Sequence, residues 1–138
     1  MVGRPARILV AEDDPASFDL LQVFLELQGY QVAAAPDGNR AIAMGGSGGF
    51  DLLILDVHMP LYGGVEVLRM LRKRHVLRPI KIIALTADAL PEVRKALEDG
   101  GIDSYLTKPV VLTKLNAEVR RLLAERQEPL PVGQGGKA

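Results

Sequence analysis

Five short apolar segments alternate with stretches of helical spacing, and this alternation constrains the fold more than any other feature. The segments span residues 8–11, 30–34, 52–55, 82–85 and 104–106. Three of them are uninterrupted apolar runs, which is typical of strands covered on both faces. Strand and helix alternate five times, so the sequence predicts an α/β fold in which helices cover both faces of a doubly wound, five-stranded parallel sheet.

The stretches between the apolar segments carry signals for five helices. The expected ranges are 15–28, 39–44, 64–74, 91–99 and a last helix from residue 112. The first is expected to begin after Asp14, which can act as an N-cap, and to end at Gly29. Four glycines and a serine at 45–49 follow the second helix, so we expect this helix to be short and the segment after it to open easily.

Length and composition limit the kind of protein. A chain of 138 residues suits one domain, which we place at residues 6–125, with 126–138 as a disordered tail or linker rich in proline and glycine. Lysine plus arginine equal aspartate plus glutamate, so no basic excess points to nucleic acid. Cysteine is absent and no apolar run approaches the roughly 20 residues of a membrane span. We therefore expect a cytoplasmic protein without membrane insertion.

Polar residues follow four of the apolar segments. They are Glu12, Asp13, Asp14, Asp56, Thr86 and Lys108. In a parallel sheet these positions are carboxyl ends of strands, where the ligands of open α/β folds bind. Two or three carboxylates form a hard, oxygen-only site, which favours Mg²⁺ over zinc. A lysine and a threonine opposite the metal can hold phosphoryl oxygens, and a carboxylate among them can become an aspartyl phosphate.

Each of these residues also has an ordinary structural explanation. Asp14 can cap the following helix, and Asp56 can belong to a turn with the prolines and glycines that follow it. Thr86 can stand at the start of a helix, and Lys108 can be a loop residue before a proline. Their joint placement after four different strands favours a shared site.

Four motifs together resemble the receiver domain of two-component response regulators. They lie at residues 9–15, 55–60 with Gly64, 84–87 and 105–109. The resemblance covers about residues 6–125. It implies the flavodoxin-like receiver fold, with five helices and the strand order 2-1-3-4-5.

The resemblance also implies the role of individual residues. Asp56 corresponds to the phosphoacceptor. Asp13 would bind Mg²⁺ directly and Glu12 through water, while the backbone carbonyl of His58 would be a further ligand.

The remaining roles concern the phosphoryl group and the switch. Lys108 would pair with the phosphoryl group, and the hydroxyl of Thr86 would move towards it. Tyr105 corresponds to the aromatic switch residue, and the Lys108–Pro109 peptide bond would be cis. Gly63 stands where many receivers carry aspartate. His58 and Asp88 border the phosphoryl pocket, so they should set the lifetime of the phosphoryl group in a direction that the sequence leaves open.

The implied function is a phosphorylation switch. A histidine kinase or a histidine phosphotransfer protein would phosphorylate Asp56, and the altered surface would act on a downstream protein target, with no direct nucleic-acid partner. The chain would not be an enzyme beyond slow autodephosphorylation. One alternative is a receiver excised from a hybrid sensor histidine kinase or multidomain regulator. Another is a small aspartyl-phosphate phosphohydrolase, a class that needs a second acid where His58 stands.

The first helix carries more apolar side chains than one sheet face can cover. Its inward stripe is Phe18, Leu21, Phe24 and Leu25, and three more apolar residues, Leu20, Val23 and Leu27, extend beyond it. Either the helix rolls to bury the three, or they stay exposed and dock the kinase.

Overall fold

All five expected strands form one parallel sheet in the order β2-β1-β3-β4-β5, as the resemblance implied. The computed structural model describes residues 4–58, 63–73, 79–87 and 90–127. The strands are β1 (Arg7–Ala11), β2 (Gln31–Ala35), β3 (Leu52–Asp56), β4 (Lys81–Thr86) and β5 (Ser104–Thr107). The predicted α/β fold class is therefore confirmed.

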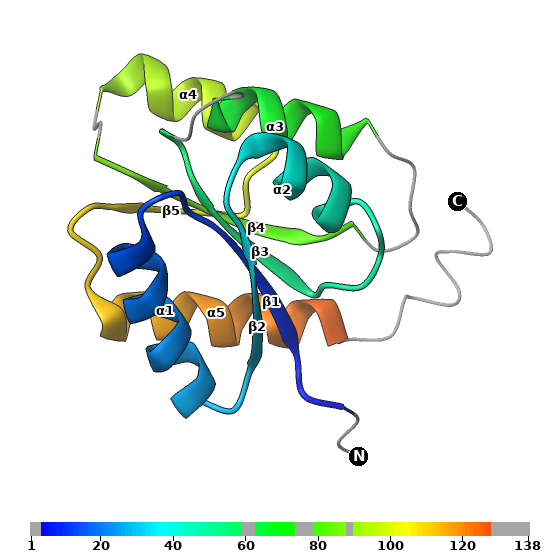
Figure 1. Cartoon of the computed structure of the whole chain (residues 1–138). Helices are drawn as coiled ribbons and strands as arrows, with labels where there is room; N and C mark the ends of the chain where they lie inside the picture. Colours follow the sequence, from blue (N-terminus) through cyan, green and yellow to red (C-terminus); the bar gives the residue numbers. More distant parts are fainter. Residues whose placement is uncertain (1–3, 59–62, 74–78, 88–89, 128–138) are drawn as a thin grey trace.

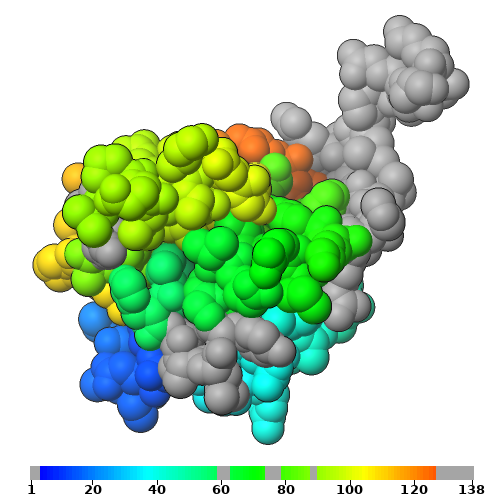
Figure 2. Space-filling model, turned by 90° about the horizontal axis from the view of Figure 1, so that it is seen from above, coloured from blue at the N-terminus to red at the C-terminus, as the bar shows by residue number. Residues whose placement is uncertain are grey.

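Five helices cover the two faces of this sheet. They are α1 (Pro15–Leu27), α2 (Gly38–Gly45), α3 (Gly64–Arg72), α4 (Pro91–Asp99) and α5 (Leu112–Gln127). Figure 1 shows α1 and α5 on one face and α2, α3 and α4 on the other. Figure 2 looks onto α3 and α4, which lie side by side along a shallow groove lined by residues of both helices.

The side chains of the uninterrupted apolar strands pack into two separate cores, one on each face of the sheet. In β1, Leu9 and Ala11 pack with the α2, α3 and α4 side, whereas Ile8 and Val10 pack with α1 and α5. All four side chains are buried because successive residues of a strand point to opposite faces. Burial on both faces explains why these segments show no apolar–polar alternation.

The segment after α2 makes contacts that its glycines did not indicate. Gly45 belongs to the helix, and a Cβ there would lie 3.2 Å from the Leu71 side chain of α3, so the absence of a side chain permits close packing. Arg7 donates a 2.7 Å hydrogen bond to the carbonyl of Gly49 and stacks over the Phe50 ring. Easy opening of this segment stays a prediction.

Several helix boundaries differ by one or two residues from the expected ones. α3 ends at Arg72, and α5 continues through Gln127, which includes two residues that we had assigned to the tail. α2 is one residue longer at each end than expected, because Asp37 caps it by accepting the backbone N–H of Arg40. Residues 128–138 lie outside the described part of the chain.

α1 does not roll to bury its extra apolar residues. Leu20, Val23 and Leu27 are 58%, 57% and 78% exposed, while Leu21 and Leu25 are buried against the sheet. Within the described residues, no helix is long and apolar enough to cross a membrane.

Candidate functional site at the carboxyl edge of the sheet

The sheet register brings the predicted site residues to one edge. Asp56 ends β3 beside Leu85 of β4, and Thr86 follows as the last residue of β4. The backbone N–H of Lys108 donates to the carbonyl of Thr86 over 2.8 Å, which places the lysine after β5 at the same edge. Glu12 follows β1 directly. Residues from four separate segments therefore converge, as predicted.

The carboxylate of Asp56 is held at both oxygens. Oδ2 accepts from Lys108 Nζ at 3.0 Å, and Oδ1 accepts from the backbone N–H of His58 at 3.0 Å. Asp56 is only 3% exposed, because every residue of β3 is buried. This carboxylate therefore has a fixed position at the mouth of the site.

Three acids share this edge with one lysine. Glu12, Asp13 and Asp56 can each place a carboxylate oxygen within 4.8 Å of the others. Glu12 is buried and lies 3.5 Å from Lys108 Nζ, and its other oxygen accepts the backbone N–H of Asp14. Asp13 is exposed to solvent. The cluster combines two buried carboxylates with one that a solvated ion can reach.

The titration of Glu12 and Lys108 reflects this crowding. Burial is the largest cause that raises the pKa of Glu12 above its ordinary value, and Asp56 adds to the rise. Burial alone would lower the pKa of Lys108, but its hydrogen bond to Asp56 and the charges of Asp56 and Glu12 outweigh it, so this pKa is raised. More positive charge among the acids would favour the ionised form of Glu12.

The donor set fits a magnesium ion. All three side chains offer hard carboxylate oxygens, and Mg²⁺ is commonly held by one or two carboxylates and several waters. A cation here would offset the mutual repulsion of the acids. The predicted roles of the His58 carbonyl as a ligand, and of Glu12 acting through water, stay predictions.

Asp14 is separate from this cluster. It is the N-cap of α1, and its Oδ2 accepts hydrogen bonds from the side chain and the backbone N–H of Ser17. These two bonds lower the pKa of its carboxyl. The capping role expected for Asp14 is confirmed.

The two expected switch residues stand on neighbouring strands. Thr86 is fully buried, and its Oγ1 lies 3.4 Å from Nε2 of His58. Tyr105 is partly buried against the core, and the guanidinium of Arg94 on α4 lies 5.2 Å from the centre of its ring. The Lys108–Pro109 peptide bond is cis, as the resemblance implied.

Two supporting features are more specific than the sequence indicated. A Cβ on Gly64 would lie 2.8 Å from Cα of Val57, so only glycine lets α3 start this close to the end of β3. Gly63 gives α3 no side-chain cap, in line with its departure from the common aspartate. Arg94 and the side chain of His58 were not expected as partners of the switch residues. Asp88 lies outside the described residues.

Comparisons with known proteins agree with this geometry. The family model described as the response regulator receiver domain matches residues 8–120. The chain is 41% identical over 125 residues to the transcriptional regulatory protein TcrA of Mycobacterium tuberculosis, covering 91% of this chain and 48% of that protein. It is 37% identical over 111 residues to the sensor histidine kinase GacS of Pseudomonas protegens, covering 78% of this chain and 12% of the kinase. The chain thus spans at most about half the length of these two relatives.

Solved structures show the same fold. The receiver domain of the sensor histidine kinase PA1611 from Pseudomonas aeruginosa, with a magnesium ion coordinated in its active-site cleft, superposes with a TM-score of 0.79 at 29% identity. That match covers 87% of this chain and 98% of the PA1611 chain. The receiver domain of Ssk1 from Saccharomyces cerevisiae, in complex with the histidine phosphotransfer protein Ypd1, gives 0.82 at 25% identity, covering 93% and 95%.

Proposed function

Because this chain belongs to the response regulator receiver domain family, we propose that Asp56 accepts a phosphoryl group from a phosphohistidine. The donor would be a histidine kinase or a histidine phosphotransfer protein. The observation that carries the proposal is the buried Asp56 carboxylate, fixed by Lys108 and the His58 backbone beside two further acids.

The transfer needs a nucleophile in place and compensation of negative charge. An Asp56 oxygen attacks the phosphorus, the P–N bond breaks, and its electron pair returns to the imidazole of the donor. Lys108, already bound to Asp56, lies where it can neutralise a phosphoryl oxygen without moving far. Bound Mg²⁺ would supply further positive charge for the phosphoryl oxygens. The edge offers Glu12, Asp13 and Asp56 to hold it.

The test uses a small phosphoryl donor. The protein is incubated with acetyl phosphate or phosphoramidate, with Mg²⁺ or with EDTA, and the mass of the intact chain is measured. We expect a phosphoryl adduct only with Mg²⁺, and none in Asp56→Asn. The control Asp99→Asn, at the exposed end of α4, should be modified like the wild type. Labelling that survives Asp56→Asn or EDTA would contradict the assignment.

The output proposed for this reaction runs through Thr86 and Tyr105. A phosphoryl oxygen on Asp56 offers the hydroxyl of Thr86 a new acceptor, and movement of Thr86 makes room for the Tyr105 ring. Tyr105 contacts Arg94 of α4, so a rotated ring would alter the surface formed by α4, β5 and α5. A downstream protein would bind this altered surface.

The proposed docking site for the donor is the exposed apolar row of α1, formed by Leu20, Val23 and Leu27. These residues lie at i, i+3 and i+7, so they share one side of the helix. Leu20 also lines a groove of about 240 Å³ that includes Glu12 and Lys108. A donor helix placed on this row would therefore lie next to the site.

A comparison of two phosphoryl donors, a cognate kinase and acetyl phosphate, distinguishes an effect on docking from an effect on the transfer reaction. We expect Leu20→Ala and Leu27→Ala to slow transfer from a cognate kinase, since burial of apolar surface is worth about 25 cal/mol per Å², and to leave labelling by acetyl phosphate unchanged. Val65→Ala, which trims an exposed apolar residue on α3, is the matched control. The docking proposal is wrong if both labelling reactions fall together or if neither falls.

The architecture around the domain is part of the proposal. Relatives include both a transcriptional regulator and a sensor kinase, so the chain fits either a receiver that acts through protein contacts or one that belongs to a hybrid kinase or multidomain regulator. In both cases we propose a cytoplasmic phosphoacceptor that is no enzyme beyond slow loss of its phosphoryl group.

A further inference from the structure

The groove between α3 and α4 takes no part in the reaction proposed above. It has a volume of about 420 Å³ and lies on the face of the sheet opposite α1 (Figures 1 and 2). Its wall is formed by Val65, Arg69, Arg72 and Lys73 of α3 and by Ala96, Asp99 and Gly100 of α4. The α3 residues recur at helical spacing, so they share one side of that helix over a length of roughly 12 Å.

The packing of the two helices gives this groove its shape. A Cβ on Gly100 would lie 2.5 Å from Cδ2 of the fully buried Leu68, so glycine lets the end of α4 lie close against α3. Arg72 donates hydrogen bonds to the carbonyls of Ile80 and Gly101, which hold its side chain against the sheet. The wall is therefore ordered before any ligand arrives, and binding there loses little conformational entropy on the side of this protein.

The wall of the groove carries more positive than negative charge. α3 contributes Arg69, Arg72 and Lys73, whereas Asp99 is the only acid among the described lining residues. Lys95 pairs with Asp99 at 3.1 Å, so α4 itself compensates this acid. The charge of the groove therefore favours an anionic ligand.

The three cations of α3 differ in how far they are already paired. Arg72 pairs with Asp103 and is largely covered, while Arg69 pairs with Glu66 but keeps 60% of its side chain exposed. Lys73 is exposed and forms no hydrogen bond or ion pair with another described residue. The pKa of the Glu66 carboxyl is lowered, mainly by its hydrogen bond to Arg69 and further by the charge of Lys73. Lys73 is thus the cation most available to a ligand.

Apolar surface lies between these charges. Val65 is 38% exposed, and Ala96 on the facing side of the groove is partly exposed. A small inorganic anion would leave this apolar surface in water. A peptide that carries both acidic and apolar side chains would cover it and pair with the cations, which is how many protein interfaces combine an apolar centre with a polar rim.

We propose that the groove between α3 and α4 binds a short acidic segment of a partner protein, with an apolar side chain against Val65 and Ala96 and a carboxylate paired with Lys73. The inference goes beyond phosphoryl transfer. Because the groove and α1 lie on opposite faces of the sheet, this partner can bind while a phosphoryl donor occupies the exposed apolar row of α1.

The test uses a fluorescent synthetic peptide of leucine and glutamate, about twelve residues long, which is enough to cover roughly 12 Å of helix wall. Its affinity for the whole chain is measured by fluorescence anisotropy in EDTA without any phosphoryl donor. Amide NMR shifts locate the bound peptide. A second peptide with glutamine in place of every glutamate is the control for charge.

Two variants of the protein test the groove itself, each with a matched control. Lys73→Glu should weaken binding about threefold to tenfold, because an attraction becomes a repulsion. Its control, Lys114→Glu, reverses an exposed lysine on α5 and should bind like the wild type. Val65→Ala should weaken binding about twofold to threefold through lost apolar contact. Its control is Met70→Ala, since Met70 is also 38% exposed on α3 but does not line the groove.

We expect NMR shifts at Val65, Lys73 and Ala96, much weaker binding of the glutamine peptide, and weaker binding of the glutamate peptide at high salt. The inference is overturned if the wild type does not bind the glutamate peptide, if the glutamine peptide binds as tightly, if the shifts map to another surface, or if Lys114→Glu weakens binding as much as Lys73→Glu. Labelling of Asp56 is measured separately, so its failure would contradict the proposed function alone.

Discussion

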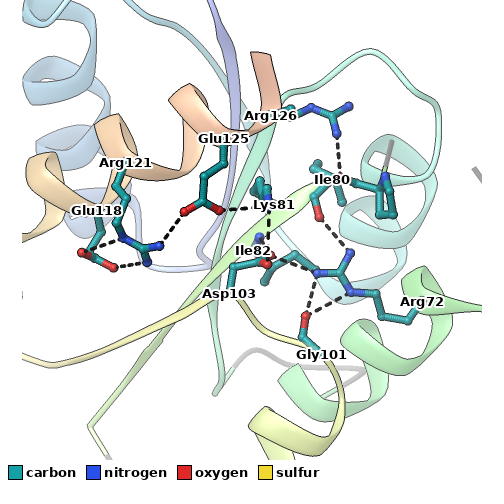
Figure 3. Close-up of polar contacts among 11 residues, drawn as sticks. Arg72, Ile80, Lys81, Ile82, Gly101, Asp103, Glu118, Arg121, Glu125 and Arg126 are labelled. Carbon is teal, nitrogen blue, oxygen red and sulfur yellow. Dashed lines mark hydrogen bonds and ion pairs between the residues drawn. The ribbon is translucent and has the colours of Figure 1, made fainter. Parts of the chain in front are cut away.

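Among the described residues, both ends of the parallel sheet carry clusters of charge, but only at the amino end are acids and bases balanced. At the amino end, Asp103 accepts from Arg72 at 3.2 Å and from the backbone N–H of Ile82 at 2.8 Å, and Arg72 also donates to the carbonyls of Ile80 and Gly101 (Figure 3). Lys81 bridges to Glu125 of α5. Acids and bases alternate there, and together they tie α3, β4, β5 and α5.

At the carboxyl end, three acids lie together, and Lys108 pairs with two of them, Glu12 and Asp56. Like charges within 4.8 Å of one another oppose folding, and burial together with the neighbouring Asp56 raises the pKa of Glu12. The charged residues at the amino end connect elements of the fold. Those described at the carboxyl end carry excess negative charge, which Mg²⁺ can offset.

The largest effect on stability is therefore expected at the amino end. Arg72→Ala should lower the free energy of unfolding by about 2–3 kcal/mol, because two carbonyls and the Asp103 carboxylate lose their donor. Labelling of the folded variant by acetyl phosphate should not change. Chemical denaturation together with the labelling assay checks both expectations.

Arg121→Ala is the matched control for Arg72→Ala. Arg121 pairs with Glu118 and Glu125 but is 47% exposed, so its loss should cost less than about 1 kcal/mol. Equal losses of unfolding free energy in the two arginine variants, or a changed labelling rate in Arg72→Ala, would contradict the distinction between the two ends.

The next effect is stabilisation by metal at the carboxyl end. Mg²⁺ at about 100 times its dissociation constant should raise the free energy of unfolding by roughly 2–3 kcal/mol. Asp13→Asn should lose most of this gain, since it removes a carboxylate ligand, while Asp99→Asn should keep it. Thermal unfolding in Mg²⁺ and in EDTA provides the measurement. A gain that survives in Asp13→Asn would place the ion elsewhere.

The smallest effect is the pH dependence caused by Glu12. Burial raises its pKa in the folded chain above the ordinary 4.5, so its stabilising contribution is present below pH 4.5 and is lost as the pH rises through the folded value. In EDTA, Glu12→Gln should thus be more stable than the wild type at neutral pH, by roughly 1 kcal/mol or less. This advantage should vanish on acidification. An advantage independent of pH would mean that Glu12 ionisation is not its source.

Much of the carboxyl end could be predicted from the sequence. The residues follow apolar segments directly, and parallel strands must place such positions at one edge. For this reason Glu12, Asp56, Thr86 and Lys108 were found as a set before their distances were known. The exposed row on α1 was also predictable, because seven apolar residues exceed one helical face.

The amino end could not be predicted in the same way. Arg72 and Asp103 are 31 positions apart and lie in no motif, so their pairing depends on how α3 and β5 pack. The contacts of the segment after α2 could not be predicted for a similar reason. Helix propensity describes an isolated segment, whereas Arg7 from β1 binds this one through tertiary contacts. The ring direction of His58 depends equally on a neighbouring strand.

Reductive trapping of the acyl phosphate identifies the residue that carries the phosphoryl group. The protein is phosphorylated with acetyl phosphate and Mg²⁺ and treated with borohydride, which reduces an aspartyl phosphate to homoserine, and the peptides are then sequenced by mass spectrometry. We expect homoserine at position 56 and at no other acid, including Asp13 beside it and Asp103 at the amino end of the sheet. Homoserine at any of these other positions, or none in a chain that carries the phosphoryl adduct, would contradict the assignment of Asp56.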